Sequence, residues 1–366
     1  MKSLLFSLGL LIAGLYAYSW HFIITVLAIS FLIFFHELGH FLAARLLGVG
    51  VNAFSIGFGE ALYSFKKGQT EYKISAIPLG GYVQLKGQDD SDPSISSNDP
   101  DSYNTLSPFG RILILVAGPA FNFLLAFFIY IAIGFLGEQR LGTVVANVAP
   151  DSAASIAGIK SGDKILSING KIVSQWSDIS PLVNTDKSEV RLKRGDEELT
   201  LIAYPKMGDG VNLFGEKISK PLLGISPSNE TVIIYHRSDA LKYAAEQTWQ
   251  ASGLIFAGIG KLLSGVVPVS EVGGIMQITD VTSKAAKTSL QMLLLIVALI
   301  SVNLGVLNLL PIPALDGGHI LFNLYELISR RAVPKRAFEY LTYAGWAVLG
   351  TLMIVATFND IMRLGQ

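Results

Sequence analysis

The sequence contains no cysteine, which excludes disulfide bonds and cysteine-based catalysis. Charge is also scarce: only 15% of its 366 residues are Asp, Glu, Lys or Arg, whereas soluble domains carry about 25%. The 28 basic and 28 acidic residues balance, so no bulk charge attracts nucleic acid, and we expect no nucleic-acid partner. Because 51% of the residues are hydrophobic, the composition predicts a multi-span membrane protein, with enough length for a water-facing domain as well.

One strongly apolar stretch, FLIFFHELGHFLAAR at residues 31–45, contains the pattern H-E-x-x-H at His36, Glu37 and His40. On an α-helix, side chains at i and i+4 lie on one face, so the two imidazoles can bind one zinc ion while Glu37 acts as general base toward water. The alternative is two core histidines and a snorkelling glutamate in a membrane helix. Because ionisable side chains are costly in lipid, we favour the functional interpretation.

Apolar stretches at residues 3–18, 22–47, 109–136, 290–310 and 338–358 are predicted to cross the membrane. The first is short, and a cleaved signal peptide is the alternative, but a second apolar run follows at once without a convincing cleavage site. The loop before the last stretch carries Arg330, Arg331, Lys335 and Arg336, which places it in the cytoplasm. Counting back puts the N-terminus inside and residues 141–288 outside the cytoplasm, in a protein of the cytoplasmic (inner) membrane.

Residues 51–87 differ from these spans because β-branched and aromatic residues are interrupted by glycines. The pattern predicts short strands and hairpins, associated with the membrane on its cytoplasmic side and followed by an acidic loop at 88–105. An exposed strand edge here could pair with an extended substrate, although an ordinary surface hairpin is the alternative. In the next span, Asn122 is a mid-span amide that needs a partner on another helix.

The segment 141–205 has the strand, helix and turn pattern of a soluble α/β domain. Its run PDSAASIAGIKSGDKILSINGK at residues 150–171 resembles the core of bacterial PDZ domains, which bind extended peptides by strand addition. We therefore predict an extracytoplasmic PDZ-like domain that binds peptide tails. Residues 206–288 are expected to form a linker that includes an amphipathic helix at the membrane interface.

A catalytic zinc site usually has three protein ligands, and the sequence offers few candidates for the third. His21 precedes the motif by fifteen residues, about 22 Å along a helix, and His236 is expected at the extracytoplasmic surface. The remaining candidates, Asp316 and His319, lie in NLLPIPALDGGH at 308–319. This segment is predicted to lie on the same side of the membrane as His36 and His40, the cytoplasmic side. His319 could ligate the metal, hydrogen-bond Asp316 or cap the following helix, and spacing alone does not choose.

The motifs FHELGHFLAAR (35–45), GFG (57–59), PLGGYV (78–83), GPAFN (118–122) and NLLPIPALDGGH (308–319) occur together with one PDZ-like core. In this combination the chain resembles the site-2 protease family of intramembrane zinc metalloproteases, and within it the bacterial regulator of sigma-E protease group. The resemblance implies that Zn²⁺ is bound by His36, His40 and Asp316. It also implies that Glu37 is the catalytic base and that Asn308 contacts substrate. Further candidate substrate contacts are Asn303, in the apolar stretch at 290–310, and Gly80 and Gly81, in PLGGYV.

The same resemblance implies an endopeptidase that cuts the membrane-spanning segments of single-pass proteins within the lipid bilayer. Such cleavage occurs in regulated intramembrane proteolysis, for example of anti-sigma factors or signal-peptide remnants. Two alternatives stay open: a non-enzymatic membrane scaffold that uses its PDZ-like domain, and a zinc peptidase for soluble peptides with its third ligand elsewhere.

The expected fold is a multi-span α-helical membrane protein with a membrane-associated β-element and an inserted extracytoplasmic PDZ-like α/β domain. The expected segments are 1–47 with the H-E-x-x-H helix, 48–108 with the β-element and acidic loop, 109–137 as a transmembrane helix, 141–205 as the PDZ-like domain, 206–288 as the linker, and 289–366 with the C-terminal transmembrane helices.

Overall fold

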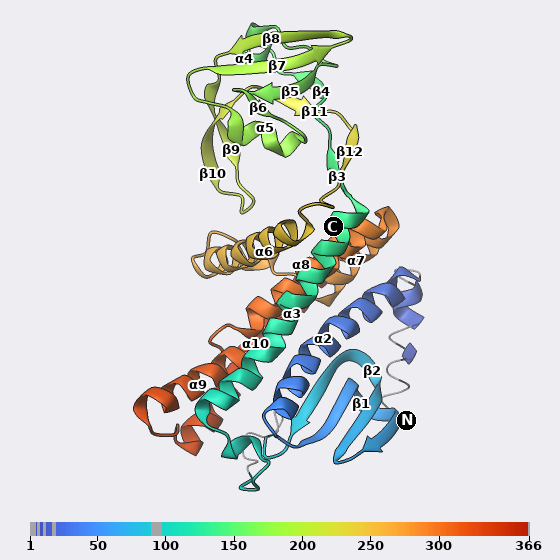
Figure 1. The fold of residues 1–366 in the computed structure, drawn as a ribbon, viewed down its shortest axis with the longest axis vertical. Coiled ribbons are helices and arrows are strands. Elements are labelled where there is room, and N and C mark those ends of the chain that lie inside the picture. The colour runs from blue at the N-terminus through green and yellow to red at the C-terminus, as the bar shows by residue number, and fades with distance from the viewer. Residues whose placement is uncertain (1–4, 6–7, 10–11, 17–19, 89–96, 365–366) are drawn as a thin grey trace. The chain divides into compact units, whose positions relative to one another are not determined.

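The computed structural model describes residues 5, 8–9, 12–16, 20–88 and 97–364 (Figure 1). The chain forms two compact units, the first made of residues 1–132, 240–260 and 268–366 and the second of residues 133–239 and 261–267. Of the predicted first membrane helix at 3–18, the described residues 5, 8–9 and 12–16 are helical. The others lie outside the described residues, so the retained first helix stays a prediction.

Four helices in the described part of the chain are long and apolar enough to cross a membrane. They are α2 (His21–Leu46), α3 (Pro108–Leu136), α8 (Leu290–Asn308) and α10 (Lys335–Leu364). Large apolar side chains such as Leu27 and Ile354 are exposed on them, as expected of surfaces that face lipid rather than water. The prediction of a multi-span membrane protein is therefore confirmed, and these helices match four of the five predicted spans.

Three of these helices pack around a small apolar core in the first unit. Leu32 of α2, Leu125 of α3 and Val297 of α8 are buried together. The approach of α2 to α3 is close because Gly39 faces the α3 backbone: a Cβ atom at Gly39 would lie 2.3 Å from the carbonyl oxygen of Ala117. This contact brings the H-E-x-x-H face of α2 directly against α3.

The predicted β-element is present as two long strands, β1 (Val51–Lys67) and β2 (Thr70–Leu85), joined at a tight turn through Gly68. Residues 53–56 of β1 pair both with residues 71–74 and with residues 81–84 of β2. The sheet packs against α2 and α3 through a core of Ala44, Val51, Phe54, Val83 and Ile114. Figure 1 shows the two strands lying alongside α2.

The remaining helices of the first unit are shorter or less apolar. They are η1 (Tyr103–Thr105), α6 (Ala240–Leu263), η3 (Val269–Glu271), α7 (Ile275–Thr288) and α9 (Asp316–Ser329). The carboxylate of Asp360 on α10 accepts hydrogen bonds from the backbone N–H groups of Gly274 and Met276, at 3.0 and 2.9 Å. This contact caps the first turn of α7 and joins it to α10.

The second unit is mainly β-structure around its own core. Its elements are β3 (Glu138–Leu141), β4 (Val145–Val148), α4 (Ala153–Ala157), β5 (Lys164–Ile168), β6 (Lys171–Ile172), η2 (Trp176–Asp178), α5 (Ile179–Leu182), β7 (Ser188–Arg194), β8 (Glu197–Ala203), β9 (Lys206–Val211), β10 (Lys217–Leu222), β11 (Ile225–Pro227) and β12 (Thr231–Ile234). A four-stranded sheet has the order β6-β5-β7-β8, and Ile165, Ile168, Val190 and Leu192 are buried beneath it. The unit is wider than the predicted segment 141–205, because β11 and β12 return to pair with β4 and β3.

Candidate metal centre

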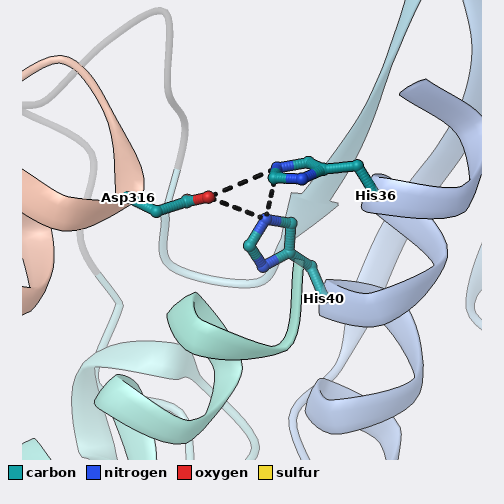
Figure 2. Close-up of side chains that lie close together, drawn as sticks. All are labelled: His36, His40 and Asp316. Atoms are coloured by element: carbon teal, nitrogen blue, oxygen red, sulfur yellow. Dashed lines mark hydrogen bonds and ion pairs between the residues drawn. The ribbon is translucent and has the colours of Figure 1, made fainter. Parts of the chain in front are cut away.

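The first half of the site is one face of α2, where His36 and His40 lie one turn apart (Figure 2). Their Nε2 atoms are 3.1 Å from each other. Both rings lie against α3 at Gly118, where an added Cβ atom would be 2.2 Å from Nε2 of His40 and 2.9 Å from Cε1 of His36. A side chain at position 118 would therefore occupy the space that the imidazoles need.

The second half of the site is Asp316, in the first turn of α9. The chain turns sharply before this helix, and the two glycines after Asp316 make the turn possible. A Cβ atom at Gly317 would lie 2.3 Å from the carbonyl oxygen of Leu310, and one at Gly318 would lie 2.3 Å from that of Ile312. The turn brings Oδ2 of Asp316 to 3.3 Å from Nε2 of His36 and 3.4 Å from Nε2 of His40.

These three atoms form a triangle that fits a zinc ion. In a tetrahedral site with zinc–ligand distances of about 2.0–2.1 Å, neighbouring ligand atoms lie about 3.3 Å apart. The observed separations are 3.1, 3.3 and 3.4 Å. Oδ2 of Asp316 is buried and makes no well-directed hydrogen bond, as expected of an oxygen whose role is to bind a cation. His36, His40 and Asp316 are the one such group of three found among the described residues.

The other ring nitrogen of each histidine also has a neighbour on α3. Nδ1 of His40 lies 2.8 Å from the backbone carbonyl oxygen of Ile114. Nδ1 of His36 lies 2.9 Å from the side-chain amide nitrogen of Asn122. The hydroxyl of Ser301 on α8 donates to the backbone carbonyl oxygen of Asn122 at 2.8 Å. The mid-span amide that was predicted to need a helix–helix partner thus has one on α2, and the backbone carbonyl of the same residue has one on α8.

A cavity of about 430 Å³ opens beside the metal group, and Glu37 lines it together with both histidines and Asp316. Gly81 on β2 is close to Glu37, because a Cβ atom at Gly81 would lie 3.7 Å from Cγ of Glu37. The β-element is therefore adjacent to the predicted catalytic base. A side chain at position 81 would also approach the carbonyl oxygen of Ser55 to 2.8 Å.

The far wall of the cavity is formed by α9 and the start of α3. His319 and Glu326 line it from α9, Arg111 lines it from α3, and Asn308 lines it from the end of α8. Arg111 and Glu326 form an ion pair at 2.8 Å.

The ring of His319 packs against Phe322 and Phe338, so the structure places it beside the metal group and not in it.

The structure does not bring every predicted residue to this cavity. Asn303 is five residues before Asn308 on α8, which turns it about 140° away around the helix, and it is not among the described residues that line the cavity. Gly80 faces Phe58, whose ring occupies the space of a Cβ atom at that position. His21 is the first residue of α2, and Nδ1 of His236 in the second unit lies 3.4 Å from Oδ2 of Asp239. Neither histidine belongs to the metal group.

Several contacts of the site could not be recognised from the sequence. The roles of Gly118 and Asn122 depend on which face of α3 meets α2, and the G-P-A-F-N motif signalled only that this part of the span is unusual. The Arg111–Glu326 pair joins residues 215 positions apart, and neither residue stands out in its own segment. The contact of Gly81 with Glu37 depends on the register of the β-element.

Comparison with known proteins agrees with this geometry. The model of the family described as "Peptidase family M50" matches residues 24–352. Three similar proteins carry names that begin "Putative zinc metalloprotease". One from Campylobacter jejuni is 53% identical over 365 residues, covering 100% of this chain and 99% of the relative. One from Helicobacter pylori is 39% identical over 350 residues, covering 94% of this chain and 99% of the relative. One from Agrobacterium fabrum is 34% identical over 358 residues, covering 93% of this chain and 95% of the relative.

Proposed function

The chain belongs to peptidase family M50, the site-2 protease family, and is a zinc metalloendopeptidase; from this we propose that it cuts other membrane proteins within their membrane-spanning segments. The observation that carries the proposal is the position of the two histidines. His36 and His40 lie inside α2, a helix long and apolar enough to cross a membrane. A peptidase whose metal group is built on such a helix acts at the depth of the bilayer.

We assign the metal to three side-chain atoms: Nε2 of His36, Nε2 of His40 and Oδ2 of Asp316. Their mutual distances of 3.1 to 3.4 Å support this assignment. Three protein ligands leave a fourth position for water or substrate, which distinguishes catalytic from structural zinc sites. When bound there, zinc polarises the water and the scissile carbonyl as a Lewis acid.

We assign the proton transfers to Glu37. Its carboxylate lines the cavity beside the two histidines, where it can take a proton from the water that attacks the scissile carbonyl carbon. The same carboxylate then gives the proton to the amide nitrogen, and the C–N bond breaks to leave a carboxylic acid and an amine. Glu37 thus acts first as base and then as acid without leaving its place on α2.

A membrane-spanning substrate must be extended before this reaction, because the carbonyls of a helix are held in i→i−4 hydrogen bonds. We propose that residues 81–85 of β2 accept the extended segment as an added strand. Gly81 lies next to Glu37, so a strand paired there would pass close to the catalytic base. Asn308, which lines the same cavity, is the proposed side-chain contact to the substrate.

We propose that the second unit contains a PDZ-like domain at 141–205 that selects peptide tails outside the cytoplasm. In support, this segment contains β4, α4, β5, β6, η2, α5, β7 and β8 in that order. A hollow of about 470 Å³ is lined by Lys164, Ile172 and Arg191 of β5, β6 and β7 among others, and it is a candidate peptide site. The proposed substrates are single-pass proteins of the bacterial inner membrane, such as anti-sigma factors or signal-peptide remnants.

The test of the proposed function separates metal binding from catalysis. Glu37→Gln keeps the size of the side chain but removes the basic carboxylate, so the variant should retain zinc and lose cleavage of a model membrane helix. Glu246→Gln is the matched control, because Glu246 is an exposed residue of α6 that forms an ion pair with Lys242, and it should retain both properties. Near-normal turnover by Glu37→Gln would contradict the assigned role.

The alternatives considered from the sequence are less well supported. Family membership and the assembled metal group favour a peptidase over a non-enzymatic scaffold. A peptidase for soluble peptides with a different third ligand would need another metal-binding side chain near His36 and His40. In the described part of the chain, Asp316 is the carboxylate that completes the group.

A further inference from the structure

Asn122 is a fully buried amide that contacts a metal-binding histidine without being a ligand itself. Its side-chain nitrogen Nδ2 lies 2.9 Å from Nδ1 of His36, and its exposed fraction is 0%. In this orientation the amide oxygen Oδ1 is buried with no hydrogen-bond partner. Buried polar atoms without partners are rare in native proteins, so the orientation of this amide requires an explanation.

A histidine that binds a metal must carry its proton on the ring nitrogen that faces away from the metal. To bind zinc through Nε2, a neutral histidine must carry its proton on Nδ1, and Nδ1–H then needs an acceptor. His40 meets this requirement, because the carbonyl oxygen of Ile114 lies 2.8 Å from its Nδ1. His36 meets an amide instead, which can present either an acceptor oxygen or a donor nitrogen.

The two orientations of the amide correspond to two states of His36. With Nδ2 toward Nδ1, the ring accepts from the amide and carries its own proton on Nε2, where it faces Oδ2 of Asp316 at 3.3 Å. With the amide turned by half a rotation, Oδ1 accepts from Nδ1–H and the lone pair of Nε2 is available to a metal. The turn gives Oδ1 a hydrogen bond and moves Nδ2 to the position that Oδ1 occupied.

We propose that Asn122 is a positioning residue that holds His36 in the Nδ1–H tautomer and so raises the affinity of the site for zinc. The inference deepens the proposed function and rests on it, because it assumes that His36 is a ligand through Nε2. Asn122 acts through His36 and touches neither the metal nor the scissile bond. It stabilises both the metal-free and the metal-bound state by turning its amide.

The surroundings hold Asn122 in place for this role. Ser301 on α8 donates to its backbone carbonyl oxygen at 2.8 Å, and both residues are buried. Gly118, one turn earlier on α3, leaves the space in which the ring of His36 lies. The hydrogen bond between His36 and Asn122 and the one from Ser301 to Asn122 thereby link α2, α3 and α8. The backbone of Asn122 is held in place, and its side-chain amide can still rotate.

The experiment measures zinc affinity by competition with a chromogenic chelator, in full-length protein carrying Glu37→Gln so that all variants are compared without peptidase activity. Asn122→Leu has a similar volume but cannot accept from Nδ1–H, and we expect its zinc affinity to fall about 10- to 100-fold. Asn122→Asp can only accept, so it should keep the affinity of the parent or exceed it. Ser301→Ala is the control, because it removes a buried hydrogen bond to the same residue but leaves the amide untouched, and it should bind zinc like the parent.

Rescue by Asp separates a positioning role from a merely structural one, since a general loss of packing would affect both Asn122 variants. If Asn122→Leu does not fold, Asn122→Ala provides the same comparison with Asn122→Asp. Parent-like zinc affinity in Asn122→Leu, or an equal loss in Asn122→Asp, overturns the inference. Absence of zinc from the parent protein would instead contradict the proposed function.

Discussion

At the scale of residues, the proposed metal centre depends on three candidate ligand atoms and on small residues that allow these atoms to approach one another. Nε2 of His36, Nε2 of His40 and Oδ2 of Asp316 come within 3.4 Å of one another. Gly118 and Gly317 have no side chain where one would collide with a histidine ring or with the preceding backbone. The metal site is therefore sensitive to changes that add a single carbon atom as well as to loss of a ligand.

The choice of Asp316 over His319 as the third ligand gives a direct comparison of two variants. Asp316→Ala removes an atom of the triangle and should abolish stoichiometric zinc binding. His319→Ala removes a ring that packs on Phe322 and Phe338 beside the site, so zinc should remain. Metal content of the two purified proteins measured by mass spectrometry checks this, and the reverse pattern would move the ligand to His319.

Gly118→Ala should disturb the site without changing any polar group. The added methyl would lie 2.2 Å from Nε2 of His40, and overpacking of this kind costs about 1–3 kcal/mol. We expect lower thermal stability and weaker zinc binding. Gly253→Ala on α6 is the matched control, because nothing lies within 4 Å of its Cβ position, and it should stabilise the helix by about 0.5–1 kcal/mol. Equal behaviour of the two variants would contradict the packing argument.

At the scale of elements, four parts of the structure contribute to the proposed centre. α2 carries two candidate ligands and the candidate base, α9 carries the third candidate ligand, and α3 carries the contacts to Nδ1 of both histidines. β2 lies beside the base through Gly81. In the second unit, Arg194 of β7 donates hydrogen bonds to the carboxylate of Asp163, in the turn before β5.

That contact predicts how the stability of the second unit depends on pH. Burial raises the pKa of Asp163, but hydrogen bonds from Arg194 and from the Lys160 backbone N–H outweigh this and hold the pKa below its ordinary value. The stabilisation is therefore fully present above the unfolded pKa of about 3.9 and is lost as the pH falls through the lower folded pKa. Asp163→Asn should lose about 1–3 kcal/mol near neutral pH and lose this pH dependence.

Urea unfolding followed by the fluorescence of Trp176 measures this prediction, in a chain whose other three tryptophans are replaced by phenylalanine. The parent should become less stable between pH 4 and pH 2 by more than Asp163→Asn does. Parallel curves for the two proteins over this range would show that the Asp163–Arg194 contact does not contribute.

At the scale of the whole molecule, the absence of cysteine makes the membrane topology directly measurable. Single cysteines at two exposed positions, Asn98→Cys after the β-element and Thr185→Cys in the second unit, should lie on opposite sides of the membrane. A membrane-impermeant maleimide added to intact cells should label Thr185→Cys, and Asn98→Cys should react only after lysis. Labelling of both, or of Asn98→Cys alone, would contradict the proposed orientation.

The sequence predicted the parts of the molecule that have a local signal. Four spans, the strands of 51–85 and the ligand pattern of His36 and His40 follow from hydrophobicity and spacing within one element. Asp316 was singled out by elimination and by resemblance, since spacing alone could not separate it from His319. The partners of Asn122 and the pairing of Arg111 with Glu326 depend on how distant helices pack. No local pattern encodes that packing.

Whether the zinc site acts within the bilayer can be measured from the position of the cut. The full-length protein and a single-pass model substrate are placed together in liposomes with zinc, and the products are identified by mass spectrometry. We expect cleavage inside the membrane-spanning stretch of the substrate, and no product with Glu37→Gln. Cuts confined to the water-exposed flanks of the substrate, or unchanged cleavage by Glu37→Gln, would contradict a zinc site built within the membrane from α2 and α9.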